Sequence, residues 1–319
     1  MNKRERVMAV LNGQKPDRIP SGFWLHFEKE AFFGDAAVKR HLEFFRESKT
    51  DICKIMNENL IPQDISLKTA ADWSNVKPID TDSAYFKRQV ALIKAISEAM
   101  AGEAVLVATI HGVVACASHM INGMDQYNAN RQILVKHYRE NPEGMKQAFR
   151  YIADYLLELT RASIEAGADG IYYAALGGER FMYTDGEFAE LVRPLELEIL
   201  ETATKLEGFN VLHICKEQVN LERFQGYPGT VVNWGIFADN PSLAEGKNLF
   251  PGKILLGGLD DRSGVLVDGS EAEITAAVHT ILTEMSNDSF YLGADCTLPP
   301  DIDMDRIRMA VAATESYNK

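Results

Sequence analysis

The chain has 319 residues, of which 46% are hydrophobic and 25% are charged, and its formal net charge at pH 7 is −13. This composition is typical of a globular protein and excludes a wholly disordered, collagen-like or coiled-coil chain. The acidic balance and the lack of a basic tract argue against a nucleic-acid partner, because an acidic surface repels the phosphate backbone.

The sequence predicts a cytoplasmic protein with no contact to a membrane. Its apolar runs are about 5–8 residues long, whereas a membrane-spanning helix needs roughly 20. The first residues are charged and no apolar stretch follows them, so we expect no signal peptide. The four cysteines are too few for a disulfide scaffold, and cysteines in a cytoplasmic protein are buried, metal-bound or reactive.

Helix-like and strand-like stretches alternate along the whole chain. A helix over residues 3–12 comes first, and Gly13 ends it. Eight predicted strands then follow in order, at residues 18–24, 51–56, 104–110, 169–173, 209–213, 230–234, 253–258 and 289–293. The clearest predicted helices lie at residues 142–165, 188–206, 271–285 and 304–317.

This alternation favours an α/β fold, because strands separated by helices form parallel sheets. Eight such units in about 300 residues indicate a single (β/α)8 TIM barrel with an N-terminal helical extension. We expect residues 1–319 to form this one domain. An open, doubly wound sheet is the alternative, but no G-x-G-x-x-G motif follows the first strand, which argues against dinucleotide binding.

His213, Cys215 and Cys296 form the sharpest candidate site. The active site of such a barrel lies at the C-terminal ends of its strands. Alternate residues of a strand point to the same side, so His213 and Cys215 can both face the barrel mouth, where Cys296 follows the eighth strand. One imidazole and two thiolates suit Zn²⁺ and leave the fourth position that a catalytic zinc uses. The alternative is that both cysteines are small packing residues.

Other polar residues allow structural as well as functional interpretations. Three histidines whose positions suit either role are His26, His111 and His119. Three histidines on helical stretches, which we expect at the surface or satisfied in the core, are His41, His137 and His279. We expect Cys53 and Cys116 to be packing residues, and Tyr172 and Tyr173 to divide between the barrel interior and the helix layer.

Carboxylates are weighed in the same way. Asp260 follows the seventh predicted strand, and it either hydrogen-bonds a substrate or caps the segment after it. Helix carboxylates such as Glu103 and Glu196 are expected to be solvated.

Four segments of the chain form a familiar set of motifs. They are KRERV…PDRIP at residues 3–20, EF…PL at residues 187–195, LGGLD at residues 256–260 and LGADCTLPP at residues 292–300. Together they resemble the uroporphyrinogen decarboxylase superfamily, along essentially the whole chain. The fold of that family is one (β/α)8 barrel, in agreement with the eight predicted strands.

The resemblance first raises decarboxylation. Decarboxylases of the superfamily remove four acetate carboxyl groups from uroporphyrinogen III without a cofactor, and their motif after the first strand carries arginines. The matching stretch here, GFWLHF at residues 22–27, has none. The resemblance aligns Glu58 with the catalytic Asp of those enzymes, His119 with a substrate-contacting Tyr and Ala294 with a late His. Because arginine pairs carboxylates bidentately, the missing arginines argue against a substrate with eight carboxylates.

The other branch of the superfamily comprises zinc methyltransferases similar to methylcobalamin:coenzyme M methyltransferases and related corrinoid-dependent enzymes. Their zinc motif, His-x-Cys and later Gly-x-x-Cys-x-x-Pro, is matched by His213, Cys215 and residues 293–299, which include Cys296. A carboxylate after the sixth strand can serve that branch as a further zinc ligand, whereas this chain has Asn233 there. The fourth ligand is then water or Glu217.

The resemblance therefore implies a zinc-dependent methyltransferase that moves a methyl group from a methylcorrinoid to a thiol or similar small-molecule acceptor. Glu58, His119 and Asp260 are its further candidate catalytic residues. The methylcorrinoid is a co-substrate brought by a corrinoid carrier protein, because the corrinoid signature Asp-x-His-x-x-Gly is absent from this chain.

Two alternatives stay open at this point. One is a cofactor-free uroporphyrinogen decarboxylase-like enzyme of tetrapyrrole metabolism, and the other is a non-catalytic zinc- or corrinoid-binding protein. Analogy with the decarboxylases of the superfamily adds a homodimer to the expectations.

Overall fold

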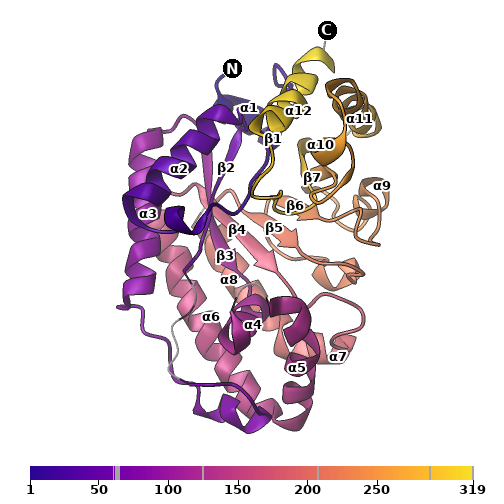
Figure 1. Cartoon of the computed structure of the whole chain (residues 1–319). Helices are drawn as coiled ribbons and strands as arrows, with labels where there is room; N and C mark the ends of the chain where they lie inside the picture. The colour runs from indigo at the N-terminus through magenta and orange to yellow at the C-terminus, as the bar shows by residue number, and fades with distance from the viewer. Residues whose placement is uncertain (60, 62–64, 124–125, 207, 287–288, 318–319) are drawn as a thin grey trace.

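Eight parallel strands form a nearly closed barrel with helices around it, as Figure 1 shows. The computed structural model describes residues 1–59, 61, 65–123, 126–206, 208–286 and 289–317. The strands are β1 (Ser21–Gly22), β2 (Ile52–Ile55), β3 (Val105–His111), β4 (Gly170–Ala175), β5 (Val211–Ile214), β6 (Val231–Trp234), β7 (Ile254–Leu259) and β8 (Phe290–Ala294). Their order in the sheet is β1-β8-β7-β6-β5-β4-β3-β2, which confirms the predicted (β/α)8 barrel.

The helices form the outer layer of the barrel (Figure 1). The predicted N-terminal extension is α1 (Lys3–Leu11), which begins at Asn2 with a capping box completed by Glu5. The other helices are α2 (Gly34–Glu47), α3 (Ala84–Met100), α4 (Val113–Asn122), α5 (Tyr127–Glu140), α6 (Pro142–Glu165), α7 (Asp185–Leu191), α8 (Arg193–Lys205), α9 (Leu243–Gly246), α10 (Gly264–Asp268), α11 (Glu271–Glu284) and α12 (Met304–Tyr317).

Seven of the eight strands begin and end within two residues of their predicted bounds. They could be recognised because strands covered on both faces read as continuous apolar runs. The exception is β1, where only Ser21 and Gly22 pair with β8. Pro20 before them has no N–H group to donate, and the N–H group of Phe23 after them donates to the side-chain oxygen of Thr50.

Side chains bridge the seam between β1 and β2, whose strands share no ladder. The fully buried carboxylate of Asp51 accepts a hydrogen bond from the Ser21 N–H at 2.9 Å. The guanidinium groups of Arg6 and Arg18 donate to the same carboxylate at 2.7 and 2.8 Å. Arg6 belongs to α1, so the N-terminal extension helps to close the barrel.

Two adjacent tyrosines of β4 divide between the two faces of the strand, as predicted. Tyr172 lines the interior of the barrel mouth, whereas the Tyr173 hydroxyl donates to Glu196 on α8 at 3.3 Å. The expectation that Glu196 is solvated is wrong, because this side chain is fully buried and also accepts from the Tyr227 hydroxyl at 2.9 Å. Burial raises the pKa of Glu196 to about 8.

Several other expectations about core residues are confirmed. Cys53 and Cys116 are buried in the packing, and burial raises the pKa of the Cys53 thiol to about 12. His41 is a satisfied core residue, since its Nδ1 donates to the carbonyl of Ala37 and its Nε2 accepts from the N–H of Met56.

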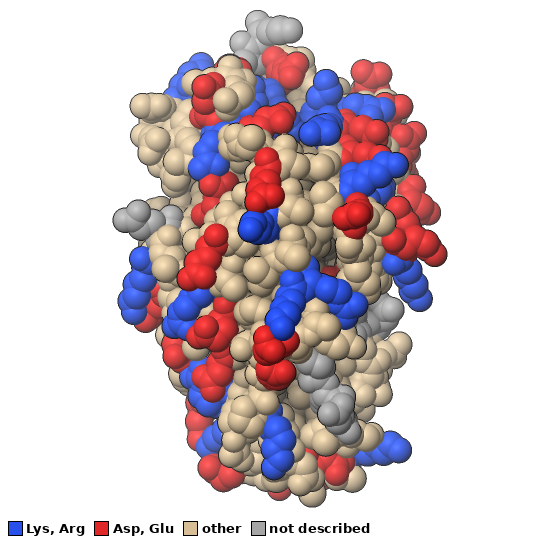
Figure 2. Space-filling model, turned by 90° about the vertical axis from the view of Figure 1, so that its left-hand side faces the viewer, with Lys and Arg blue, Asp and Glu red and all other residues tan. Residues whose placement is uncertain are grey.

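The surface carries mixed charge. On the face of the molecule that Figure 2 shows, acidic and basic side chains are interspersed, with no gathering of the blue groups into one basic surface. Within the residues that the structure describes, every helix is too short or too polar to span a bilayer.

Candidate metal centre

A cavity of about 300 Å³ opens among the C-terminal ends of the strands. Its walls carry histidine, cysteine, lysine and tyrosine side chains from β2, β3, β4, β5 and the segments that follow β5, β7 and β8. Its described lining residues include no aspartate or glutamate. In an acidic protein, this cavity is therefore a locally basic place, and we call it the mouth cavity.

The structure brings His213, Cys215 and Cys296 together in the wall of the mouth cavity. The imidazole Nε2 of His213 lies 3.4 Å from the Sγ of Cys296, and the two Sγ atoms lie 3.8 Å apart. All three atoms lie within 4.8 Å of one another. His213 is on β5, and Cys215 and Cys296 directly follow β5 and β8, so the parallel strands carry the three side chains to the same end of the barrel.

These separations fit a tetrahedral zinc ion. With Zn–S bonds of about 2.3 Å and Zn–N bonds of about 2.0–2.1 Å, two sulfurs of a tetrahedron lie about 3.8 Å apart, and a sulfur and a nitrogen about 3.5 Å apart. The donors are an imidazole and two thiols, which zinc favours over hard cations such as Mg²⁺. Three protein donors leave a fourth position for water or a substrate.

Asn233 fixes the tautomer of His213. The two residues are register partners on β6 and β5, and the His213 Nδ1 lies 2.5 Å from the Asn233 Oδ1. The amide nitrogen of Asn233 donates to the carbonyls of Leu256 at 2.8 Å and Ala294 at 3.2 Å, so its oxygen must be the acceptor. His213 therefore carries its proton on Nδ1 and presents the lone pair of Nε2 to the two sulfurs. Such an outer hydrogen bond is typical of metal-binding histidines.

The two thiols are not equivalent in the absence of a metal. A hydrogen bond joins the sulfurs of Cys215 and Cys296, and the His213 imidazole lies beside Cys296. Both contacts hold the pKa of Cys296 well below its usual value. The same hydrogen bond, together with burial, raises the pKa of Cys215. Cys296 is thus the sulfur that ionises first, which prepares it to bind a cation.

Two residues next to this set were not singled out from the sequence as functional. The ring of Tyr172 stacks on His213 with centroids 5.2 Å apart, and its hydroxyl donates to Asn233 at 3.4 Å. The ammonium group of Lys54 lies over two aromatic rings. Its Nζ atom is 4.1 Å from the centroid of the Tyr172 ring and 5.5 Å from that of the Trp24 ring. The available signal was a lysine inside the otherwise apolar run ICKI of β2.

Glu58 follows β2 and pairs with a histidine of the cavity. Its Oε1 lies 2.7 Å from the Nδ1 of His26, while its buried Oε2 has no hydrogen-bond partner among the described residues. The His26 side chain is 39% exposed and lines the mouth cavity, whereas Glu58 lies behind it. A carboxylate that holds one ring nitrogen leaves the other free to exchange protons with a substrate or with water.

His111 and His119 form a second pair of rings in the cavity lining, with centroids 5.1 Å apart. The Nε2 of His111 donates to the carbonyl of Asn57 at 2.8 Å. Burial lowers the pKa of His111 to about 4 and that of His119 to about 3. Both rings are therefore neutral at physiological pH.

Asp260 and Glu217 lie outside the mouth cavity. The Asp260 carboxylate accepts hydrogen bonds from the N–H groups of Arg262 and Ser263, which is the capping arrangement considered from the sequence. It thereby holds the loop whose Arg262 side chain lines the cavity. Glu217 pairs with Arg131 at 2.5 Å, which gives its carboxylate a cationic partner other than a metal.

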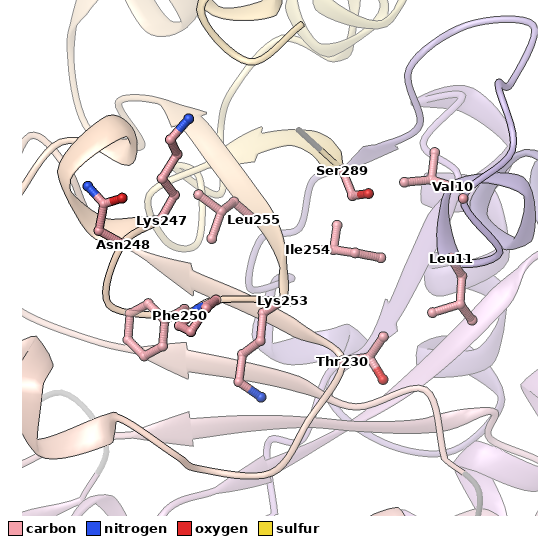
Figure 3. Close-up of a pocket in the computed structure, with 13 residues that line it drawn as sticks. Val10, Leu11, Thr230, Lys247, Asn248, Phe250, Lys253, Ile254, Leu255 and Ser289 are labelled. Atoms are coloured by element: carbon pink, nitrogen blue, oxygen red, sulfur yellow. The ribbon is translucent and has the colours of Figure 1, made fainter. Parts of the chain in front are cut away.

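A larger hollow lies at the opposite end of the barrel. It has a volume of about 510 Å³ and is drawn in Figure 3, where Ile254 at the start of β7 and Ser289 just before β8 lie on the side of Val10 and Leu11 of α1. Its described lining has no histidine, cysteine, aspartate or glutamate. Its described lining thus lacks the side chains that commonly bind transition metals, so size alone does not indicate the site.

Comparison with known proteins identifies the family. The model of the uroporphyrinogen decarboxylase (URO-D) family matches residues 56–317. The chain belongs to this enzyme family, which confirms the resemblance seen in its motifs. No curated protein sequence matches the chain.

Solved structures of the same fold include methyltransferases. A methyltransferase from Methanosarcina mazei superposes with a TM-score of 0.74 and 16% identity over 100% of both chains. A B12-independent methionine synthase from Shewanella sp. W3-18-1, solved in complex with selenomethionine, superposes with a TM-score of 0.63 and 13% identity, over 94% of this chain and 97% of that one. At these identities the likeness concerns the fold.

Proposed function

We propose that this protein is a zinc-dependent methyltransferase that moves a methyl group from a methylcorrinoid to a small-molecule thiol or similar acceptor. The observation that carries the proposal is the convergence of the His213 Nε2 with the sulfurs of Cys215 and Cys296 at the barrel mouth. Asn233 holds the imidazole in the tautomer that binds metal. The fold that the chain shares with the methyltransferase from Methanosarcina mazei agrees with this proposal.

His213, Cys215 and Cys296 would hold the zinc ion, with its fourth position open to the mouth cavity. When bound, the ion supplies Lewis acidity that lowers the pKa of an acceptor thiol and keeps it as a nucleophilic thiolate at neutral pH. Asn233 keeps the His213 ring oriented, and the stacked Tyr172 ring restricts the imidazole from its face.

The remaining candidate residues take supporting roles in this proposal. His26 accepts the proton of the acceptor thiol and passes it to water at the rim, because its ring is partly exposed and Glu58 holds its Nδ1. His119 is a neutral wall of the acceptor cavity. Asp260 has a structural role, because its carboxylate caps the turn that follows β7.

The methyl donor is proposed to arrive on a separate corrinoid carrier protein that docks over the mouth. A cavity of about 300 Å³ suits a small acceptor, and a macrocycle has to approach from outside it. The protein acts in the cytoplasm in this proposal, and a homodimer agrees with the analogy to family decarboxylases.

Uroporphyrinogen decarboxylation is the competing function within the family. It requires several cationic groups for a substrate with eight carboxylates. The stretch at residues 22–27 has no arginine, and Ala294 stands where the decarboxylases have a histidine. The incubation that separates the two functions uses uroporphyrinogen under anaerobic conditions, and we expect no appreciable coproporphyrinogen.

The central experiment combines metal analysis with methyl transfer. We expect one zinc per chain, and anaerobic demethylation of methylcobalamin to cob(I)alamin in the presence of the right thiol, with homocysteine and coenzyme M in the panel. Cys215→Ser should lose this activity by far more than it loses stability, because a serine oxygen is a poor replacement for thiolate on zinc. If zinc binds but no thiol adds sulfur to its shell, the thiol acceptor is wrong. If metal-free protein has full thermal stability and takes up no zinc on titration, the metal site is wrong.

A further inference from the structure

Lys54 places a buried positive charge in the mouth cavity. It lies on β2, is 5% exposed and belongs to the cavity lining. The contacts of its Nζ atom are aromatic, with Tyr172 at 4.1 Å and Trp24 at 5.5 Å. Buried ion pairs of the described residues, such as Arg6–Asp51 and His26–Glu58, involve other groups, and none of them includes Lys54.

A buried charge without an ion partner is costly unless the site supplies one. Aromatic faces attract a cation but carry no net negative charge. Burial lowers the pKa of Lys54 to about 8, and the negative charges that act on it in the opposite direction are those of Cys296, Glu58 and Cys215. Lys54 lines the same cavity as His213, Cys215 and Cys296. The Tyr172 ring beneath its ammonium group stacks on His213, so the charge lies next to the metal-binding set.

The charge of the metal set explains what Lys54 can do there. Zn²⁺ with two thiolates and a neutral imidazole has a net charge of zero. An acceptor that binds as a thiolate makes the assembly −1, in a cavity whose described lining holds no carboxylate. A buried ammonium group restores neutrality, and its effect is large because water does not screen it.

We propose that Lys54 is a positioning residue whose charge stabilises the acceptor thiolate beside His213, Cys215 and Cys296. This inference rests on the proposed thiol methyltransferase function and adds a determinant of acceptor binding to it. The other cation suited for comparison is Arg262, whose side chain is 61% exposed and already pairs with Asp261 at 2.9 Å. Water and Asp261 both weaken its influence on a thiolate.

The test measures thiol binding rather than turnover. Cobalt(II)-substituted protein is titrated with 2-mercaptoethanol, and the thiolate-to-cobalt absorption band reports sulfur binding. Lys54→Met keeps most of the stem length but removes the charge. We expect the dissociation constant to rise at least about tenfold at pH 7, because a unit charge in the same partly desolvated cavity has that much influence. Arg262→Met is the matched control and should change the constant by less than about threefold.

A purely structural role predicts a different pattern. Lys54→Met removes a buried charge without an ion partner, so the metal-free variant should unfold at the same temperature as the wild type or at a higher one. Its affinity for cobalt should equal that of the wild type. Weaker thiol binding accompanied by a lower unfolding temperature or by loss of metal would overturn the proposal. Unchanged thiol binding in Lys54→Met would overturn it as well.

2-Mercaptoethanol carries no charge besides its thiol, so it distinguishes a role of Lys54 at the thiolate from recognition of a carboxylate elsewhere on the acceptor. If 2-mercaptoethanol binds equally to both proteins while 3-mercaptopropionate binds only the wild type strongly, Lys54 recognises a distant carboxylate and the thiolate role is wrong. If the metal-loaded wild type binds no thiol at all, the proposed function fails and the Lys54 inference fails with it. If the wild type binds thiol and Lys54→Met binds it with the same affinity, the Lys54 inference fails and the proposed function stands.

Discussion

Two carboxylates at each end of the barrel differ in how completely their oxygens are hydrogen-bonded. At the N-terminal ends of the strands, Asp51 accepts hydrogen bonds at both oxygens from Arg6, Arg18 and Ser21. Asp169 likewise binds Arg4 through one oxygen and the N–H of Leu106 through the other. At the mouth, Glu58 and Asp295 each leave one buried oxygen without a hydrogen-bond partner among the described residues.

This difference follows from what each end has to do. Satisfied buried polar groups stabilise a fold, whereas unsatisfied ones cost free energy and are tolerated where a ligand or ion completes them. The hollow of Figure 3 is larger than the mouth cavity, yet its described lining has no histidine, cysteine, aspartate or glutamate. In such barrels one end serves stability and the other serves function.

The largest expected effect is the loss of metal from the mouth. Cys296→Ala should lower zinc affinity by about a hundredfold to a thousandfold, since a zinc site with four ligands is worth roughly 10–16 kcal/mol in total and each ligand about a quarter of it. Metal analysis after dialysis and circular dichroism should show a folded barrel without zinc. Cys53→Ala is the matched control, because Cys53 is a buried packing residue of β2. Equal zinc loss in both variants would contradict the assignment of Cys296 as a metal ligand and Cys53 as a packing residue.

A change at the opposite end should affect stability and leave the metal in place. Asp51→Ala leaves Arg6 and Arg18 buried without their carboxylate, so the free energy of unfolding should fall by about 3–5 kcal/mol. Asp17→Ala removes an exposed partner of the same Arg6 and should cost about 1 kcal/mol or less. Denaturant titration measures both changes. Loss of zinc from the folded Asp51→Ala protein would contradict the separation of the two ends.

A smaller effect on the metal is expected from Asn233. Asn233→Leu removes the acceptor of the His213 Nδ1 proton, so the imidazole can rotate or change tautomer. Outer partners of this kind are worth about 10–100-fold in metal affinity. A competition titration with a chelator measures the change. Asn233→Asp should retain or increase zinc affinity, because a carboxylate accepts the same hydrogen bond, and a loss equal to that of Asn233→Leu would refute the tautomer argument.

The sequence was sufficient to predict the barrel because each of its units is local. Apolar runs and the helices between them place seven strands within two residues, and alternation along β5 places His213 and Cys215 on one side. It was not sufficient for contacts between units. Lys54 became interesting only when β2 brought it to Tyr172 on β4, and Glu196 is buried because Tyr173 and Tyr227 provide hydroxyls for its carboxylate.

The smallest predicted effect concerns a histidine near the mouth whose polar atoms are satisfied. The Nδ1 of His41 donates to the Ala37 carbonyl at 2.7 Å, and its Nε2 accepts from the Met56 N–H at 3.0 Å. Protonation of Nε2 would break the second hydrogen bond, and burial lowers the pKa of His41 to about 4. The unfolded chain, with an ordinary histidine pKa of about 6.5, therefore binds a proton first as the pH falls.

It follows that the stability His41 contributes is complete above about pH 6.5 and is lost as the pH falls towards 4. His41→Gln should unfold more easily at pH 7, yet its free energy of unfolding should depend less steeply on pH, by about 1 kcal/mol per pH unit between pH 6 and 5. Urea titrations of both proteins across this interval measure the difference. Parallel pH profiles would mean that His41 has the same pKa in the folded and the unfolded chain. The contrast between satisfied and unsatisfied groups near the mouth would then not extend to this residue.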